Sequence, residues 1–187
     1  MNVVLVVASA LLVVALLLVA WFVVTYNSLI RGRNAADNAW AQVDVQLKRR
    51  YDLVPNLIET VRGYAAHERA TLDSVVAARA AAISAHGPAH QAQAEEMLSG
   101  ALRGLIAVAE AYPQLRAGRN FADLQAELAD TENRIAYARQ YYNDAVLTYN
   151  NAVQTVPTAL VATTTGFWQR EFFQPAGVEH GPVQVRF

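Results

Sequence analysis

The sequence predicts an all-α protein: an N-terminal single transmembrane helix followed by an antiparallel four-helix bundle and a short irregular C-terminal tail. An apolar run from Val3 to Val24 carries no charge. Proline and glycine divide the remainder into stretches rich in helix-forming residues, and the last long stretch repeats apolar residues at spacings of three and four. We expect residues 3–24 to span the membrane, residues 25–156 to form the bundle and residues 157–187 to form the tail.

The apolar run has the length of a membrane span. Ser9 is its only polar side chain, and at 1.5 Å per residue the run extends about 33 Å, against a hydrocarbon core of about 30 Å. A cleaved signal peptide is the alternative. No basic residue precedes the run, it exceeds the usual 7–15 residues of a signal sequence, and no small-x-small cleavage site follows it. These features favour a retained anchor that contacts membrane lipid.

Charge placement predicts the orientation of the anchor. Arg31 and Arg33 follow the run closely, and basic residues flank the cytoplasmic end of a membrane helix. We therefore expect the N-terminus outside and the bundle in the cytoplasm. The 15 basic and 16 acidic residues give a formal charge of −1, which lacks the basic excess of a nucleic-acid-binding protein. The absence of cysteine fits either side of the membrane.

Four amphipathic helices are expected after the anchor, over residues 27–51, 54–86, 89–111 and 121–155. The last has the strongest pattern, an apolar repeat held over about five heptads. Pro55 is interpreted as the first-turn proline of the second helix, where its missing N–H costs nothing; the alternative is a kink in one continuous helix. Each helix carries one apolar stripe, so the helices must pack together.

Several motifs resemble the LemA family. They are Asn38-Ala39-Trp40, residues 43–50 and 52–61, Gly63-Tyr64-Ala65, His67-Glu68, residues 110–113, Asn120-Phe121, Leu124-Gln125, residues 131–135 and 142–144, and Gly166-Phe167 with Phe172-Phe173. The resemblance covers nearly the whole chain. It implies a bacterial protein of the plasma membrane with an N-terminal membrane helix and a four-helix bundle, and it supplies no reaction. Gly32 departs from the family pattern, which has a larger apolar residue there, so this position is either a hinge or a tolerated, frayed turn.

No motif in the sequence indicates catalysis. There is no phosphate-binding loop, nucleophile elbow or thiol. His67-Glu68 begins like a zinc-protease motif, but Thr71 replaces the second histidine, and the Glu-x-x-His motif of di-iron bundles is absent. We predict a non-enzymatic scaffold, adaptor or self-assembling surface without cofactor, metal, nucleic acid or small-molecule substrate. A membrane-tethered enzyme or a metal-binding bundle with an unrecognised active site is the alternative.

Two groups of residues are candidates for contact with a protein partner or a second copy. Polar residues beside the apolar stripes either fix the register of the helices or form a docking surface: Asp44, Asn56, Glu59, Glu68, Asn133, Arg134 and Asn143. Aromatic residues of the tail either fold back and cap the bundle or form an interaction patch: Phe167, Trp168, Phe172 and Phe173. Residues 163–166 before them have small side chains and are expected to be flexible. The basic cluster Lys48-Arg49-Arg50 is interpreted as a solvated helix end.

Overall fold

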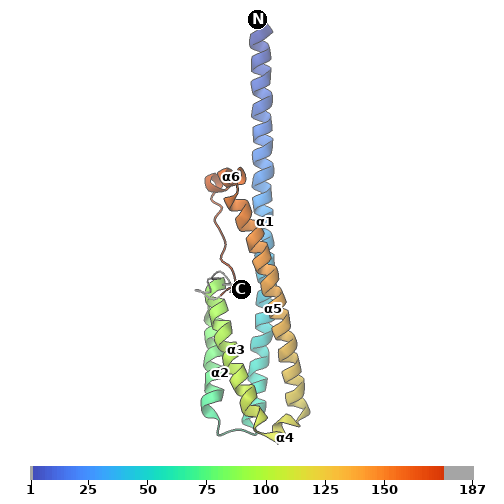
Figure 1. Ribbon diagram of the computed structural model, residues 1–187, viewed down its shortest axis with the longest axis vertical. Coiled ribbons are helices and arrows are strands. Elements are labelled where there is room, and N and C mark those ends of the chain that lie inside the picture. The colour runs from blue at the N-terminus through green and yellow to red at the C-terminus, as the bar shows by residue number, and fades with distance from the viewer. Residues whose placement is uncertain (1, 175–187) are drawn as a thin grey trace, which may run out of the picture. The chain divides into compact units, whose positions relative to one another are not determined.

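The computed structural model describes residues 2–174, and these form helices and connecting segments without a strand. The helices are α1 (Asn2–Arg62), α2 (Arg69–Ser84), α3 (Pro88–Glu110), α4 (Pro113–Arg116), α5 (Arg119–Gln154) and α6 (Thr158–Thr165), drawn in Figure 1. The predicted all-α class is confirmed. The antiparallel four-helix topology and the predicted boundaries at residues 24 and 156 stay predictions.

The chain forms two compact units. Unit 1 comprises Met1–Ala39 with Asp144–Arg170, and unit 2 comprises Trp40–Asn143 with Glu171–Phe187. Helices α1 and α5 each contribute to both units, whereas α2, α3 and α4 belong to unit 2 and α6 belongs to unit 1.

The N-terminal part of α1 is long and apolar enough to cross a membrane. Its most apolar window has a mean hydropathy of 3.3, and none of that window is buried. Large apolar side chains on all sides of a helix are stable when lipid surrounds them. The same helix continues without interruption to Arg62.

The predicted helix boundary before Pro55 is wrong, because Pro55 lies inside α1. A proline cannot donate to the carbonyl four residues earlier, which here is that of Tyr51. The Nε of Arg79 in α2 donates to this carbonyl oxygen at 2.8 Å. The carbonyl is therefore satisfied by another helix, and α1 ends only at residue 62. The second predicted helix is divided accordingly between α1 and α2.

Gly32 is neither a hinge nor a frayed turn, since α1 is helical through it. A Cβ at this position would lie 3.3 Å from Cδ2 of Tyr149, which is buried. Burial also raises the pKa of Tyr149. The small residue lets the ring of Tyr149 approach the backbone of α1, which explains why a larger apolar residue is absent here.

Unit 2 has a hydrophobic core to which α1, α2, α3 and α5 all contribute. Its fully buried members include Val54 and Val61 of α1, Val75 of α2, and Leu98 and Leu105 of α3. Phe121 and Leu128 of α5 complete it. Unit 1 has a smaller core formed by Leu29, Tyr149, Val161, Ala162 and Phe167.

The C-terminal segment contains a helix where the sequence predicts irregular structure. Residues Thr158–Thr165 form α6, so the expected flexibility of residues 163–165 is wrong. Gly166 ends the helix at a φ of 76°, a left-handed conformation that glycine adopts without strain. The rest of the predicted tail, residues 175–187, lies outside the described residues.

Candidate functional site

An open groove runs between α1 and α5 on unit 2. It has a volume of about 660 Å³ and is lined by Ala41, Gln42, Val45, Gln46, Asp130, Asn133, Arg134, Tyr137 and Ala138. We call it the α1–α5 groove. The spacing of its α5 residues by three and four places them on one helix face. Val45 and Tyr137 are its most exposed large side chains, with 63% and 76% of their surfaces accessible.

The polar groups of the groove differ in how they are satisfied. The Nε of Arg134 donates to Oδ2 of Asp130 at 2.7 Å, one turn earlier on α5. The Oε1 of Gln46 is buried and has no hydrogen-bond donor within residues 2–174. The groove therefore offers a paired cation and two exposed apolar side chains, while Oε1 of Gln46 lies beneath its surface.

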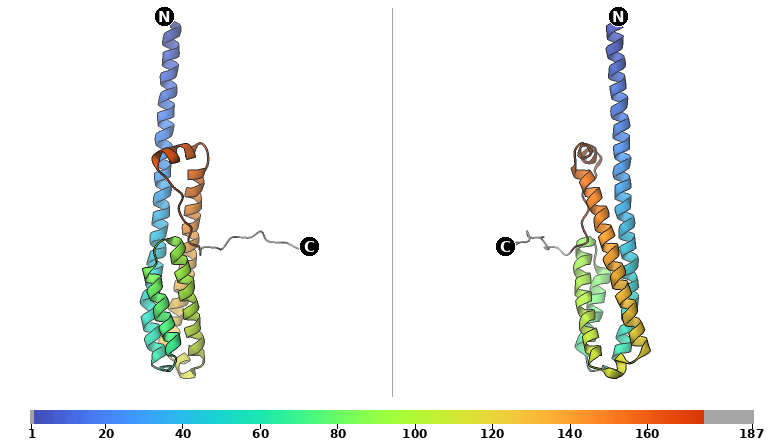
Figure 2. Two further views of the ribbon diagram at one scale, coloured as in Figure 1. Left: turned by 90° about the vertical axis from the view of Figure 1, so that its left-hand side faces the viewer. Right: turned by 45° about the vertical axis from the view of Figure 1, so that its right-hand side comes forward.

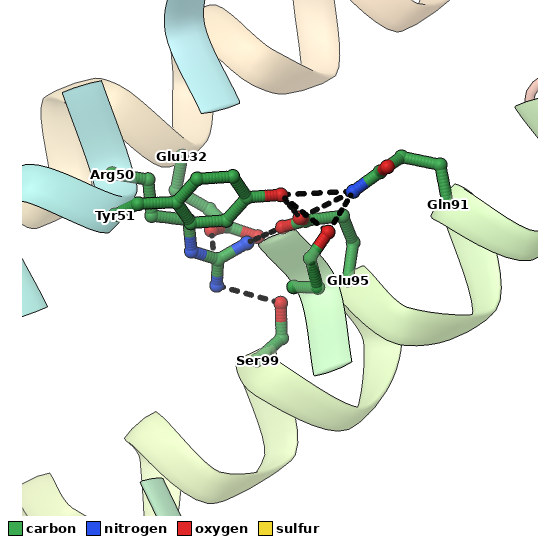
Figure 3. Close-up of polar contacts among 7 residues, drawn as sticks. Arg50, Tyr51, Gln91, Glu95, Ser99 and Glu132 are labelled. Atoms are coloured by element: carbon green, nitrogen blue, oxygen red, sulfur yellow. Dashed lines mark hydrogen bonds and ion pairs between the residues drawn. The ribbon is translucent and has the colours of Figure 1, made fainter. Parts of the chain in front are cut away.

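A buried polar cluster lies between α1, α3 and α5 (Figure 3). The guanidinium of Arg50 donates through Nη1 to Oε2 of Glu95 at 3.0 Å, and through Nη2 to Oγ of Ser99 at 2.7 Å. Nη2 also lies 3.0 Å from Oε2 of Glu132. Only 3% of the Arg50 side chain and 8% of the Glu95 side chain are exposed. We call these residues, with Tyr51 and Gln91, the Arg50 cluster.

Tyr51 and Gln91 complete the cluster on the other side of Glu95. The hydroxyl of Tyr51 donates to Oε1 of Glu95, and Nε2 of Gln91 donates to the Tyr51 oxygen at 2.8 Å. Burial raises the pKa of Tyr51 well above its ordinary value of 10.0; the hydrogen bond to Glu95 and its charge add to this, while Arg50 opposes it. Tyr51 thus stays a hydrogen-bond donor, and the cluster connects three helices through charged and neutral groups.

The interpretation of Arg50 as part of a solvated helix end is wrong. Because α1 continues to Arg62, Arg50 lies in mid-helix and points into unit 2. The sequence contains a signal for this: Arg50 continues the stripe of Val43, Leu47, Val54, Leu57 and Val61. Glu95 similarly precedes Leu98 and Leu102 on the buried face of α3. Arg49 instead reaches Glu127 on the surface, with Nη2 at 3.1 Å from Oε1.

The candidate polar residues lie in different environments. Asp44, Asn56 and Glu59 are exposed, and Asn133 and Arg134 line the α1–α5 groove. Oε1 of Glu68 accepts a hydrogen bond from the Tyr112 hydroxyl at 3.5 Å. Asn133 and Arg134 lie together in the groove, and the exposed Asn56 and Glu59 lie three residues apart on one face of α1.

Asn143 and Asn150 each hold the backbone of the segment that follows α6. In unit 2, Oδ1 of Asn143 accepts from the backbone N–H of Phe173 at 2.9 Å. In unit 1, Asn150 uses both ends of its amide on Arg170: Oδ1 accepts from the N–H at 2.8 Å, and Nδ2 donates to the carbonyl at 2.9 Å. Asn150 is buried and was not predicted from the sequence.

The four aromatic residues of the tail do not form one patch. Phe173 is buried and meets the ring of Trp40 edge-on, with centroids 5.6 Å apart. Phe167 is buried in unit 1 against Tyr26, also at 5.6 Å. Phe172 is half-buried, and Trp168 is exposed. Two of the rings therefore pack into the fold, and Trp168 remains available for another contact.

No group of three or more His, Cys, Asp or Glu side chains that could hold a metal ion occurs within residues 2–174. His67, the histidine of the incomplete zinc-protease motif, is exposed.

Comparison with known sequences identifies the relatives of this chain. The profile of the LemA family matches residues 39–187. The chain belongs to the LemA family. The expected resemblance is thus confirmed, and the LemA match includes the α1–α5 groove, the Arg50 cluster and α6.

Named LemA-family relatives are distant in sequence. The chain is 28% identical to the magnetosome proteins MamQ 1 and MamQ 2 of Paramagnetospirillum magneticum, over 90% of this chain and 74% of theirs. It is 23% identical to the protein LemA of Metamycoplasma hominis, over 85% of this chain and 73% of that relative.

Proposed function

We propose that this LemA-family chain is a non-enzymatic, single-pass membrane scaffold or adaptor that binds a protein partner through the α1–α5 groove. The groove is the observation that carries the proposal. Its exposed Tyr137, Val45 and Arg134 include residue types that are enriched where proteins bind one another. The anchor would be the exposed apolar part of α1.

The shape and chemistry of the groove suit one kind of partner, an amphipathic helix. A groove between two helices accepts a third helix whose apolar residues recur every three and four positions. Val45 and Tyr137 supply exposed apolar contacts for such a helix, and Arg134 supplies a charge beside them.

The proposal places the anchor in the bacterial plasma membrane, with the N-terminus outside and unit 2 in the cytoplasm. Arg31 and Arg33, which follow the apolar part of α1 within ten residues, support this orientation. The partner would accordingly be cytoplasmic or bound to the cytoplasmic face of the same membrane.

A photocrosslinking amino acid at position 137 tests the groove in native membranes. We expect it to capture one protein in stoichiometric amount, and mass spectrometry should place the crosslink on a helical segment with apolar residues at spacings of three and four. Val45→Glu, which adds a charge to the groove, should abolish the crosslink without lowering membrane recovery. The matched control is the same photocrosslinker at Ile83, an exposed apolar residue of α2 outside the groove.

Two outcomes would contradict partner binding at the groove. One is equal capture from positions 137 and 83, which would indicate random contact. The other is a crosslink at position 137 that Val45→Glu leaves unchanged. A crosslink to a second copy of this chain would show that the groove mediates self-assembly, and the adaptor role would then be wrong.

A further inference from the structure

The surroundings of α6 distinguish it from the other surface helices. No charged residue lies between Asp144 and Arg170, a stretch that includes all of α6. Four large apolar side chains in this stretch are exposed: Leu147 on α5 at 50%, and Val156, Leu160 and Trp168 in or beside α6, with 72%, 62% and 76% of their surfaces accessible. A water-facing segment would be expected to carry charges rather than these groups.

The position of α6 along α1 is fixed by packing within unit 1. Val161 of α6 shares a core with Leu29 of α1, and Phe167 after α6 packs edge-on against Tyr26. The guanidinium of Arg33 lies over the Phe167 ring, 5.4 Å from its centroid. Leu29 is five residues beyond Val24, the last residue of the apolar run, or about 7.5 Å along the helix.

That level corresponds to the interface of a bilayer. Interfacial helices bury their apolar side about 5–10 Å into the boundary between headgroups and acyl chains. Such a helix lies in the membrane plane, and therefore across a helix that spans the membrane. Both views in Figure 2 show α6 lying crosswise beside α1 within unit 1.

Three of the four threonines of α6 satisfy their hydroxyl groups within the helix itself. Thr163 donates to the carbonyl of Ala159 at 2.9 Å, Thr164 to that of Leu160 at 2.9 Å, and Thr165 to that of Val161 at 2.6 Å. Hydroxyls paired in this way lose less when the helix leaves water. These three threonines are thus compatible with a lipid environment.

We propose that α6, together with the residues on either side of it, is an interfacial membrane segment that inserts Leu160 of α6 and the flanking Val156 and Trp168 into the bilayer that α1 crosses. This rests on the proposed function, because it requires α1 to be the anchor. The lipid contact would fix unit 1 to the membrane at two places. A tryptophan beside such a helix suits this position, since its ring favours the interface.

The absence of cysteine makes the test direct, because single cysteines can carry a nitroxide label in the full chain. Leu160→Cys and Trp168→Cys report on α6. Leu18→Cys lies in the proposed anchor, and Leu147→Cys on α5 is an exposed control in the same unit. Each labelled chain is reconstituted into phosphatidylethanolamine–phosphatidylglycerol vesicles. Collision rates are measured with oxygen, which concentrates in lipid, and with a nickel chelate, which stays in water.

We expect a several-fold higher ratio of oxygen to nickel collisions at positions 160 and 168 than at position 147, with the highest ratio at position 18. A high ratio at 18 but a ratio at 160 and 168 equal to that at 147 would overturn the interfacial helix while leaving the anchor intact. Nickel access at 18 would overturn the anchor, and the interfacial helix with it. Low collision rates with both reagents at 160, together with broadening between labels, would show a second copy covering α6 and would overturn the lipid contact.

Discussion

Arg50 and Arg134 both pair with carboxylates in unit 2, but their environments are opposite. Arg50 is buried and bound by Glu95, Ser99 and Glu132, which come from two other helices. Arg134 is about half exposed and bound by Asp130 on its own helix. An exposed pair within one helix stabilises little because water competes for both charges. The comparison predicts that the fold of unit 2 depends on Arg50 and that Arg134, which lines the α1–α5 groove, contributes little to stability.

The largest loss of stability should come from removing the buried arginine, Arg50. Arg50→Ala leaves Glu95 buried without its cation, so we expect the free energy of unfolding to fall by about 3–5 kcal/mol. Thermal unfolding of the full chain in detergent, followed by circular dichroism, measures the loss. Arg49→Ala is the matched control, since Arg49 and Glu127 are both substantially exposed. Equal losses for the two variants would refute the role given to the Arg50 cluster.

A second arginine, Arg79, tests how much stability depends on satisfying a backbone carbonyl, that of Tyr51, rather than a buried charge. Arg79→Ala removes the donor to the carbonyl of Tyr51, and we expect a loss of about 1.5–3 kcal/mol. In a Pro55→Ala background, the new N–H can bond that carbonyl, so the same substitution should cost clearly less. Unfolding of the four chains forms a double-mutant cycle. Additive effects would contradict the compensation of Pro55 by Arg79.

The pH dependence of the Arg50 cluster sharpens the comparison further. Tyr51 has a raised pKa in the folded chain, so its contribution to stability is complete below pH 10, the ordinary value, and is lost as pH rises from there toward the folded value. We expect Tyr51→Phe to lower stability at neutral pH and to make the decline above pH 10 less steep. Melting temperatures across this pH range give the slope. A decline above pH 10 that is as steep for Tyr51→Phe as for the unaltered chain would contradict this role of Tyr51.

The smallest effect on stability is expected from the exposed pair. Arg134→Ala should cost only about 0.3–0.5 kcal/mol, as for other exposed pairs one helical turn apart. It should nevertheless weaken capture of a partner by the photocrosslinker at Tyr137, because Arg134 lines the groove. Melting temperature and crosslink yield are compared in the same preparations. A loss of stability as large as that of Arg50→Ala would instead indicate that Arg134 fixes the register of the helices.

Much of the fold could be predicted because local patterns determine it. The apolar run, the helical stretches and the buried stripe of α5, including Phe121, Leu128 and Ile135, follow from hydropathy and periodicity over neighbouring residues. The α6 helix was missed because it is short and has no amphipathic pattern of its own, and Pro157 before it suggests an end rather than a start. Of the residues that line the groove, the sequence singled out only Asn133 and Arg134 of α5. The other side of the groove is formed by α1, and a local pattern does not show which helix packs beside α5.

The sequence by itself determined that this protein has a long apolar helix, that the rest is helical, and that it resembles the LemA family. Only the tertiary structure decided which groups pair with the buried polar residues and how the chain passes Pro55. The physical reason is that the cost of burying a polar group depends on its partners, and those partners come from distant positions. Glu95 is 45 residues from Arg50, and Arg79 is 28 residues from the carbonyl that it satisfies. Packing of the helices brings these groups together, and no local pattern encodes it.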